Sequence, residues 1–230
     1  MSVVTSELED GICILRIDHG QPNSISAEVS QALMQGLDEA EKSADAIVLL
    51  GRPGMFSGGF DLPTMGKGPK AVREMLKAGA ELLMSIYNHP KPVVTGCGGH
   101  AVAMGAFIAM AGDERIGAEG KFKIGMNETA IGMTLPTFGF ELARARLSKR
   151  HYDRAVVHST MYDPAGAVEI GILDRLVESD RLEAECIEAA KRLGELKQPA
   201  FRNNKRIAHA ETVDRILSTL DENLNALMPG

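Results

Sequence analysis

The sequence of 230 residues contains no tryptophan, and aromatic residues of all kinds make up only 4% of it. Surfaces that hold single-stranded nucleic acid stack the bases on aromatic side chains, so this composition argues against such a surface. The net charge of -6 provides no basic field that would attract phosphate groups. We therefore exclude nucleic acid as a partner of this chain.

Cysteine is scarce as well. The three cysteines, Cys13, Cys97 and Cys186, are scattered and show no CxxC pair or metal-binding spacing. We therefore expect a reducing compartment, the cytoplasm, and no metal site. Residues 1–10 contain acidic side chains and no apolar core, unlike a signal peptide. The longest apolar run, 101–111, is shorter than the roughly 20 residues that a membrane span needs.

Short apolar runs bounded by glycine and proline are typical of a mixed α/β fold. We predict strands at residues 3–8, 12–17, 46–50, 93–95, 113–117, 121–124 and 173–177. We predict helices after Ser26, from 67 to 90 and from 104 to 111, and a mostly helical chain from Pro136 onward. No linker or repeat divides the chain clearly, and the apolar stripes of residues 181–227 need a partner surface.

The stretch Phe56-Ser57-Gly58-Gly59-Phe60-Asp61-Leu62 carries the first functional signal. It follows the apolar run 46–50 and a turn, so its glycine pair is predicted just past the carboxyl end of a strand, where open α/β layers bind ligands. Gly58 and Gly59 lack Cβ atoms, which lets the backbone bend sharply and approach a small molecule. Backbone N–H groups in such a place can stabilise an anion, although a lone glycine pair is more often only a tight loop.

A second glycine segment runs from Gly96 to Gly99 and leads into the helix predicted at 104–111, whose N-terminus offers unpaired N–H groups. One N–H from each segment would form a two-donor oxyanion hole, in which removing one donor costs roughly 3–4 kcal/mol of transition-state stabilisation. Glu128 follows among apolar residues and glycines, and partial burial there would raise its pKa and make it a base near neutral pH. The residues alone leave open that Glu128 is a surface carboxylate.

These segments belong to an ordered set of motifs. They are Ile47-Val48-Leu49-Leu50-Gly51 before Phe56-Ser57-Gly58-Gly59-Phe60-Asp61-Leu62, Lys91-Pro92-Val93-Val94 before Gly99-His100-Ala101-Val102-Ala103-Met104-Gly105, then Asp113, Asn127-Glu128, Gly132 and residues 165–174. In combination they resemble the crotonase (enoyl-CoA hydratase/isomerase) superfamily over nearly the whole chain. The resemblance implies a spiral of strand-strand-helix (ββα) turns at 1–180 and a C-terminal helical subdomain at 181–230 used in oligomer contacts. It also implies a homotrimer or a dimer of trimers.

The resemblance further implies an acyl-CoA thioester as the substrate and no metal or redox cofactor. In this family the thioester oxygen accepts N–H bonds from the two residues that correspond to Phe60 and Met104. Glu128 corresponds to one of the two glutamates of the hydratases. The other residues expected to contact substrate or CoA are Ser57, Gly58, Gly59, Asp61, Leu62, Gly105, Phe107 and Asn127.

Glu128 matches the second of these glutamates; the first would fall at position 107, where this chain has Phe107, and phenylalanine can neither hold water nor move a proton. The resemblance is therefore closest to the Δ3,Δ2-enoyl-CoA isomerases. Their mitochondrial members also lack that glutamate and keep the other one in an Asn-Glu-Thr setting, as in Asn127-Glu128-Thr129. In such an isomerase of fatty-acid metabolism, one base takes a proton from C2 and returns it at C4 while the oxyanion hole holds the enolate.

Two alternatives stay open at this point: a hydratase in which Glu128 does both tasks, and an acyl-CoA-binding relative without activity. A decarboxylase or dehalogenase on the same scaffold is a further possibility. The chain departs from the family at Ala103-Met104, where many members have glycines, and at Pro63, where some carry a lysine that contacts adenine. The basic residues considered for CoA contacts are Lys67, Lys70 and Arg73.

Four other polar residues near the motifs are expected to have structural roles, namely His100, Asp61, Asp113 and Cys97. The two aspartates would accept backbone N–H groups, and Cys97 would fill a small gap in the packing. Asn127 either orients Glu128 or faces solvent.

Overall fold

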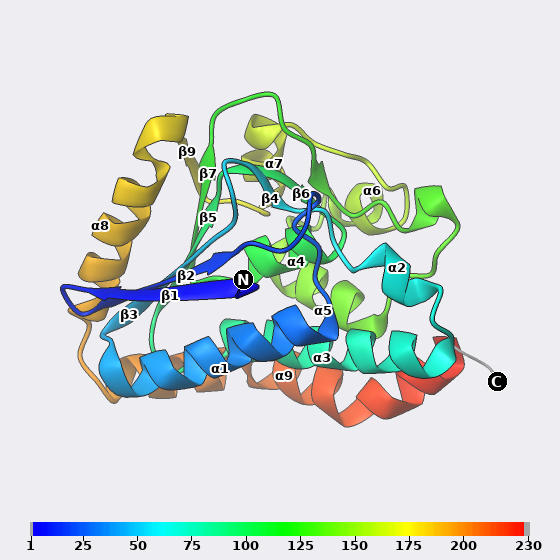
Figure 1. Ribbon diagram of the computed structural model, residues 1–230, viewed down its shortest axis with the longest axis horizontal. Helices are drawn as coiled ribbons and strands as arrows, with labels where there is room; N and C mark the ends of the chain where they lie inside the picture. Colours follow the sequence, from blue (N-terminus) through cyan, green and yellow to red (C-terminus); the bar gives the residue numbers. More distant parts are fainter. Residues whose placement is uncertain (1, 228–230) are drawn as a thin grey trace.

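A six-stranded sheet lies at the centre of the structure, a computed structural model in which residues 2–227 are described (Figure 1). Its order is β1 (Val4–Glu9), β2 (Ile12–Ile17), β3 (Ala46–Leu50), β5 (Val93–Cys97), β7 (Glu114–Ala118) and β9 (Arg175–Val177). The first two strands are antiparallel and the other neighbours are parallel. A second, parallel sheet contains β4 (Gly54–Ser57), β6 (Gly99–Val102) and β8 (Ile124–Gly125).

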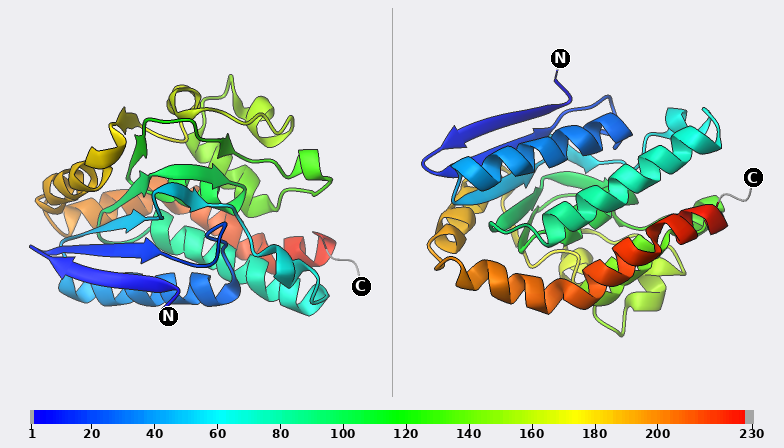
Figure 2. Two further views of the ribbon diagram at one scale, coloured as in Figure 1. Left: turned by 45° about the horizontal axis from the view of Figure 1, so that its top comes forward. Right: turned by 90° about the horizontal axis from the view of Figure 1, so that it is seen from below.

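Helices cover both faces of the larger sheet (Figure 2). The α-helices within residues 2–227 are α1 (Ala27–Ser43), α2 (Leu62–Met65), α3 (Pro69–Tyr87), α4 (Met104–Ala111), α5 (Thr137–Arg146), α6 (Tyr152–Val156), α7 (Pro164–Ile170), α8 (Leu182–Gly194) and α9 (Ala200–Leu227). Two short 3-10 helices, η1 (Thr129–Ile131) and η2 (Ser179–Arg181), complete the elements. The mixed α/β architecture predicted from the sequence is confirmed.

The alternation of side chains along β3 explains why the sheet is covered on both sides. Ile47 and Leu49 point into the main core with α1 and α3, whereas Val48 and Leu50 point into a second core with α8. All five residues of β3 are buried, as expected for a parallel strand between two layers of helices.

The predictions for α1 and α3 are confirmed. The side chain of Ser26 accepts a hydrogen bond from the N–H of Val29 at 3.2 Å and so caps α1. The apolar face predicted for this helix is buried. Helix α3 begins at Pro69 and ends at Tyr87, before Pro90, which cannot continue a helix.

The glycine-rich segments differ from the prediction. Gly96 and Cys97 are the last residues of β5 and Gly99 is the first of β6, so the predicted loop from Gly96 to Gly99 is wrong. The physical reason is that both strands need glycine. A Cβ on Gly96 would lie 2.4 Å from Leu50, and a Cβ on Gly99 would lie 2.0 Å from the backbone of Gly54. Close packing, rather than a turn, explains these glycines.

Other predicted boundaries are also corrected. Only Ile124–Gly125 forms a strand within the region around 121–124, and the strand predicted at 173–177 begins at Arg175. The strand predicted at 113–117 runs from Glu114 to Ala118. The prediction missed β4 and α2 because both are too short to show a periodic pattern. The Gly58-Gly59 pair therefore follows β4 of the second sheet, not β3 directly.

The C-terminal helices find partner surfaces within the chain. Helix α8 packs on the second face of the sheet, and α9 lies along α3 and α5. On α9, Ile216, Leu220 and Leu224 are buried, whereas Ile207 and Leu217 are 70% and 45% exposed. The stripe predicted for this helix is thus only partly correct. The division of the chain at residue 180 and the oligomer stay predictions, and residues 228–230 lie outside the described residues.

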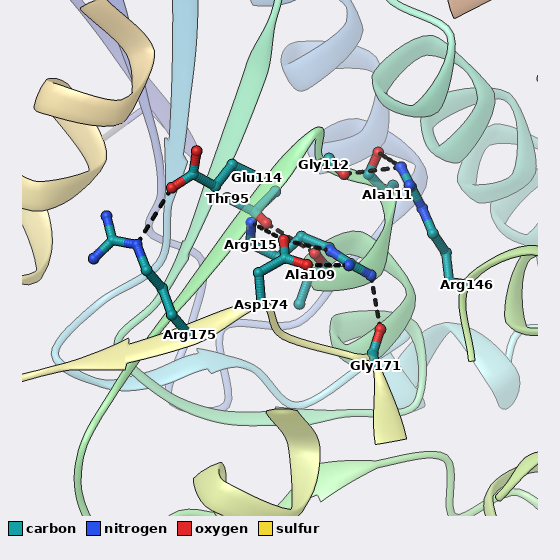
Figure 3. Close-up of polar contacts among 10 residues, drawn as sticks. All are labelled: Thr95, Ala109, Ala111, Gly112, Glu114, Arg115, Arg146, Gly171, Asp174 and Arg175. Atoms are coloured by element: carbon teal, nitrogen blue, oxygen red, sulfur yellow. Dashed lines mark hydrogen bonds and ion pairs between the residues drawn. The ribbon is translucent and has the colours of Figure 1, made fainter. Parts of the chain in front are cut away.

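Polar contacts fix the remaining segments (Figure 3). The backbone N–H of Arg115 in β7 donates to Asp174 at 2.8 Å, and its Nη1 donates to the carbonyl of Gly171 at 2.7 Å. The hydroxyl of Thr95 in β5 donates to the carbonyl of Ala109 at 2.8 Å, which ties the C-terminal half of α4 to the larger sheet. No helix within residues 2–227 is long and apolar enough to cross a membrane.

Candidate active site

A cavity of about 660 Å³ lies between α2, α3, the segment 127–136 and the end of α9. Its lining residues are predominantly apolar, and they are Gly58, Phe60, Leu62, Met65, Val72, Leu76, Ala103, Phe107, Asn127, Glu128, Ile131, Gly132, Met133, Thr134, Pro136, Phe138, Ala226 and Leu227. Among these described residues, Glu128 is the single titratable side chain. A cavity of this size with few polar groups is typical of a small-molecule site.

The first glycine loop is held from both sides. The N–H of Gly58 donates to the carbonyl of Pro22 at 2.7 Å, and the N–H of Gly59 donates to the hydroxyl of Ser57 at 3.1 Å. Gly59 has φ +99°, a conformation that side-chain-bearing residues rarely adopt. A Cβ there would lie 2.9 Å from the Cβ of Ala103 and 3.5 Å from the nitrogen of Met104. The two predicted segments therefore meet at Gly59.

The backbone of Phe60 is oriented by its neighbours. Ile25 donates to the carbonyl of Gly59 at 2.8 Å and accepts from the N–H of Asp61 at 3.1 Å. Since successive peptide groups of an extended segment point to opposite sides, the N–H of Phe60 points away from Ile25. The Phe60 ring packs against Gly79 of α3, where a Cβ would come within 2.6 Å of it.

The second donor segment is the start of α4. Met104 is its first residue, and an N–H at that position has no acceptor within the helix. Ala103 precedes it with φ +51°, a strained value for alanine. A Cβ on Gly105 would lie 2.3 Å from the carbonyl oxygen of Ser57, so the helix start rests directly on the end of β4. The Met104 side chain is fully buried and packs toward α3, out of the way of its own N–H.

Glu128 lies in the wall of this cavity, at the start of η1. Its Oε2 is buried and has no hydrogen-bond partner within residues 2–227. Burial raises the pKa of the Glu128 carboxyl above its ordinary value, and a hydrogen bond from its own backbone N–H offsets this only in part. The carbonyl of Glu128 accepts from the N–H of Met133 at 2.9 Å, which closes the turn. A carboxylate in this setting favours taking up a proton.

Phe107, predicted from the motifs to stand in place of the other hydratase glutamate, lies in the cavity wall. It is 1% exposed and meets Phe138 edge to face, with ring centroids 6.4 Å apart and an interplanar angle of 82°. Phe60 contacts the same ring edge to face at 6.5 Å. The three rings form an apolar part of the cavity wall, which Glu128 also lines.

The remaining predicted residues fall into two groups. Leu62 and Asn127 line the cavity, and Leu62 is 69% exposed at its mouth. Asp61 instead caps α2, accepting from the N–H and the hydroxyl of Thr64 at 3.1 and 2.7 Å. Burial would raise the pKa of Asp61, but hydrogen bonds from Thr64 and Ser24 outweigh it and hold the pKa below the ordinary value.

The structural roles expected for three further residues agree with their contacts. His100 accepts from the N–H of Lys123 at 2.9 Å, and Asp113 accepts from the N–H of Val93 at 2.8 Å. Burial raises the pKa of the Cys97 thiol to about 12, which leaves it unreactive. Arg73, considered for CoA, binds Asp221 of α9 at 2.7 Å instead of standing free.

Some lining residues carried no signal in the sequence. Phe138, Ala226 and Leu227 reach the cavity because α5 packs against α4 and α9 packs against both α3 and α5. In the sequence, Phe138 looks like any apolar residue of a helix. The residues at the end of α9 belong to no motif that would predict a binding site. No cluster of three or more side chains suited to a metal is present within residues 2–227.

The comparison with known proteins agrees with this arrangement. The family model described as enoyl-CoA hydratase/isomerase matches residues 7–227. The chain belongs to this family. It is a member of the crotonase superfamily, and the resemblance inferred from its motifs is confirmed. The specific activity is a separate question, because relatives with different activities share the family.

Individual relatives illustrate that range. The crystal structure of an enoyl-CoA hydratase/isomerase family protein from Pseudomonas syringae matches with a TM-score of 0.96 and 35% identity over 98% of both chains. A probable enoyl-CoA hydratase from Mycobacterium tuberculosis matches with a TM-score of 0.91 and 32% identity, over 95% of this chain and 93% of that one. The mitochondrial enoyl-CoA delta isomerase 1 of Homo sapiens is 27% identical over 216 residues, which are 92% of this chain and 72% of that protein.

Proposed function

We propose that this enoyl-CoA hydratase/isomerase family member is a Δ3,Δ2-enoyl-CoA isomerase of fatty-acid metabolism, with Glu128 as the proton shuttle. One observation carries the proposal: among the described residues that line the cavity, Glu128 is the single titratable side chain, and most of its neighbours in the lining are apolar. Moving a proton between two carbons of the same substrate needs one base. Adding water across a double bond needs a water molecule held in place as well, and the lining residues within 2–227 include no second carboxylate to hold one.

The proposed reaction begins with the Glu128 carboxylate taking a proton from C2 of a 3-enoyl thioester. The C–H electron pair moves into the C1–C2 bond, and the thioester carbonyl becomes an enolate oxygen. The N–H groups of Phe60 and Met104 donate to that oxygen. The Glu128 carboxyl then delivers its proton to C4, the double bond moves to C2–C3, and the carbonyl re-forms. No atom is gained or lost overall.

The environment of Glu128 supports this role. Its raised pKa makes the carboxylate a stronger base than an exposed glutamate, because the neutral form is favoured in the apolar cavity. The Phe107 and Phe138 rings exclude water beside it, which protects the enolate from the wrong proton donor. The two proposed donors lie close to Gly59, since a Cβ there would be 3.5 Å from the nitrogen of Met104 and Phe60 is the next residue. A two-donor oxyanion hole formed by them would stabilise the transition state by several kcal/mol.

The purified protein is tested with 3-enoyl-CoA and 2-enoyl-CoA esters of graded chain length. We expect the conjugated thioester absorbance to appear from the 3-enoyl esters and to persist with the 2-enoyl esters. Rapid loss of absorbance from 2-enoyl-CoA would identify a hydratase instead. CoA-ester binding without any turnover would identify a relative without activity.

The matched variants are Glu128→Gln and Glu188→Gln, the second on the exposed face of α8. Glutamine keeps the size of glutamate but accepts no proton, so Glu128→Gln should lower kcat by roughly 10²- to 10⁴-fold and leave binding of the ester nearly unchanged. Glu188→Gln should behave as the unaltered protein. An unchanged rate in Glu128→Gln would reject the assignment.

A further inference from the structure

The turn that carries Glu128 is tied to a distant loop by one side chain. The hydroxyl of Ser159, in the segment between α6 and α7, accepts a hydrogen bond from the backbone N–H of Ala130 at 3.1 Å. Ala130 is the middle residue of η1 and lies two residues after Glu128, and an N–H in a first helical turn has no acceptor within that turn. Ser159 thus supplies the acceptor from 29 residues further along the chain.

Ser159 adopts an unfavourable backbone conformation to do so. Its φ is +52°, in the left-handed region that glycine occupies freely and serine rarely does. The following residues dock onto β8: Tyr162 and Ile124 exchange two backbone hydrogen bonds of 2.9 Å, and a Cβ on Gly125 would lie 3.1 Å from the carbonyl of Thr160. The loop is therefore fixed to the strand that leads into Glu128.

The rest of the turn has little to hold it. Residues 129–134 are all exposed, and their backbone hydrogen bonds to Asn127 and Glu128 stay within the turn itself. On its N-terminal side the turn is anchored by β8. The Ser159 contact anchors the other side, so it limits how far the Glu128 carboxylate can swing relative to the cavity.

We propose that Ser159 is a positioning residue, whose hydroxyl holds the η1 turn so that Glu128 faces the reacting carbons of the substrate. This inference rests on the proposed function of Glu128 as the proton shuttle. Ser159 itself is not among the residues that line the cavity. Its strained backbone is the cost of placing an acceptor beside Ala130.

The decisive variant is Ser159→Gly, because glycine relieves the backbone strain while removing the acceptor. We expect its melting temperature to be unchanged or higher, its kcat to fall roughly tenfold, and its KM to stay within about twofold. The pH at which kcat reaches half its maximum should also fall, because a looser turn admits water to Glu128 and reduces the effect of burial on its pKa. Ser159→Asn should restore most of the rate, because asparagine tolerates this backbone and offers a carbonyl oxygen.

The control is Asp10→Gly, since Asp10 has φ +48° in the β1–β2 turn and lies outside the cavity lining. It relieves a similar strain and should leave kcat unchanged. Hydrogen exchange of residues 127–133 provides a readout that needs no activity, and it should be faster in Ser159→Gly than in Asp10→Gly.

Three results would overturn the inference: a Ser159→Gly protein with unchanged kcat, a loss of rate that merely follows a loss of stability, or unchanged hydrogen exchange of the turn. With an active protein that Glu128→Gln abolishes, any of these refutes the role of Ser159 alone. Absence of isomerase activity in the unaltered protein refutes the proposed function, and the positioning role with it.

Discussion

Replacing Gly79 by alanine tests whether the Phe60 backbone is held where catalysis needs it. Gly79 lies inside α3, and a Cβ there would stand 2.6 Å from Cε1 and Cζ of Phe60 and 3.3 Å from Cε of Met104. Carbon atoms in contact are normally about 3.5–4.0 Å apart, so the Phe60 ring must move by about 1 Å. Both residues proposed as oxyanion-hole donors are thus pushed by one methyl group.

The expected effects on stability and on rate differ in size. Alanine should gain about 1 kcal/mol of helix propensity over glycine, and the overpacking should cost about 1–3 kcal/mol. The net loss in the free energy of unfolding is therefore about 0–2 kcal/mol. Because a 1 Å displacement of a positioned group can cost about 100-fold in rate, we expect kcat to fall about 10- to 100-fold.

The matched control is Gly36→Ala in α1, where a Cβ would lie 2.8 Å from Cδ2 of Leu15. Neither Gly36 nor Leu15 lines the cavity. Urea unfolding and turnover of 3-enoyl-CoA are measured for both variants. If Gly79→Ala loses stability like Gly36→Ala but keeps its kcat within twofold, the link between Phe60 packing and the oxyanion hole is refuted.

Three further changes have defined outcomes. Burial raises the pKa of Glu128 in the folded state above its value in the unfolded chain. The free energy of unfolding therefore falls as the pH rises from the unfolded-state pKa through the folded-state pKa. Above that pH range Glu128→Gln should melt at a higher temperature than the unaltered protein, and in acid it should lose this advantage. Ala103→Gly removes the strain at φ +51° and should raise the free energy of unfolding by about 1 kcal/mol, as followed by urea unfolding; a lower value would contradict the strain argument. Lys205→Met leaves Asp113 without the ammonium group that binds it at 2.6 Å and should lower the free energy of unfolding by about 3–5 kcal/mol. Adding Asp113→Asn to the same chain should restore part of this loss. A loss below about 1 kcal/mol would mean that water replaces the ion pair.

The sequence was sufficient for elements whose signal is local. The apolar run 46–50 and the capped helix after Ser26 were predicted correctly, since burial, periodicity and capping all act over a few residues. The segment from Gly96 to Gly99 was predicted wrongly because glycine serves both turns and close packing, and only the neighbouring strands decide between the two. The prediction that the whole C-terminal apolar stripe is buried was partly wrong, because burial also depends on neighbouring elements. Ile207 has no covering surface within the described chain.

In the candidate site too, residues with a local sequence signal were predicted, and residues whose role depends on distant elements were not. The glycine loops and Glu128 were found from motifs, because backbone donors and a lone carboxylate leave recognisable patterns. Phe138, Leu227 and Ser159 were not found, because their roles depend on helices and loops that meet only in three dimensions. Ser159 had one possible signal, a polar residue next to a turn, but the sequence does not reveal that its partner is Ala130.

The cavity wall joins residues near position 60 to Ala226 and Leu227 at the far end of α9. A nascent chain that has left the ribosome only as far as α8 can form the larger sheet. The cavity beside α3 is then still open on the side that α9 covers in the folded chain. Its apolar rim would then be available to chaperones until α9 docks beside α3. Closure of the cavity therefore depends on a helix more than 130 residues away from the first glycine loop in the sequence.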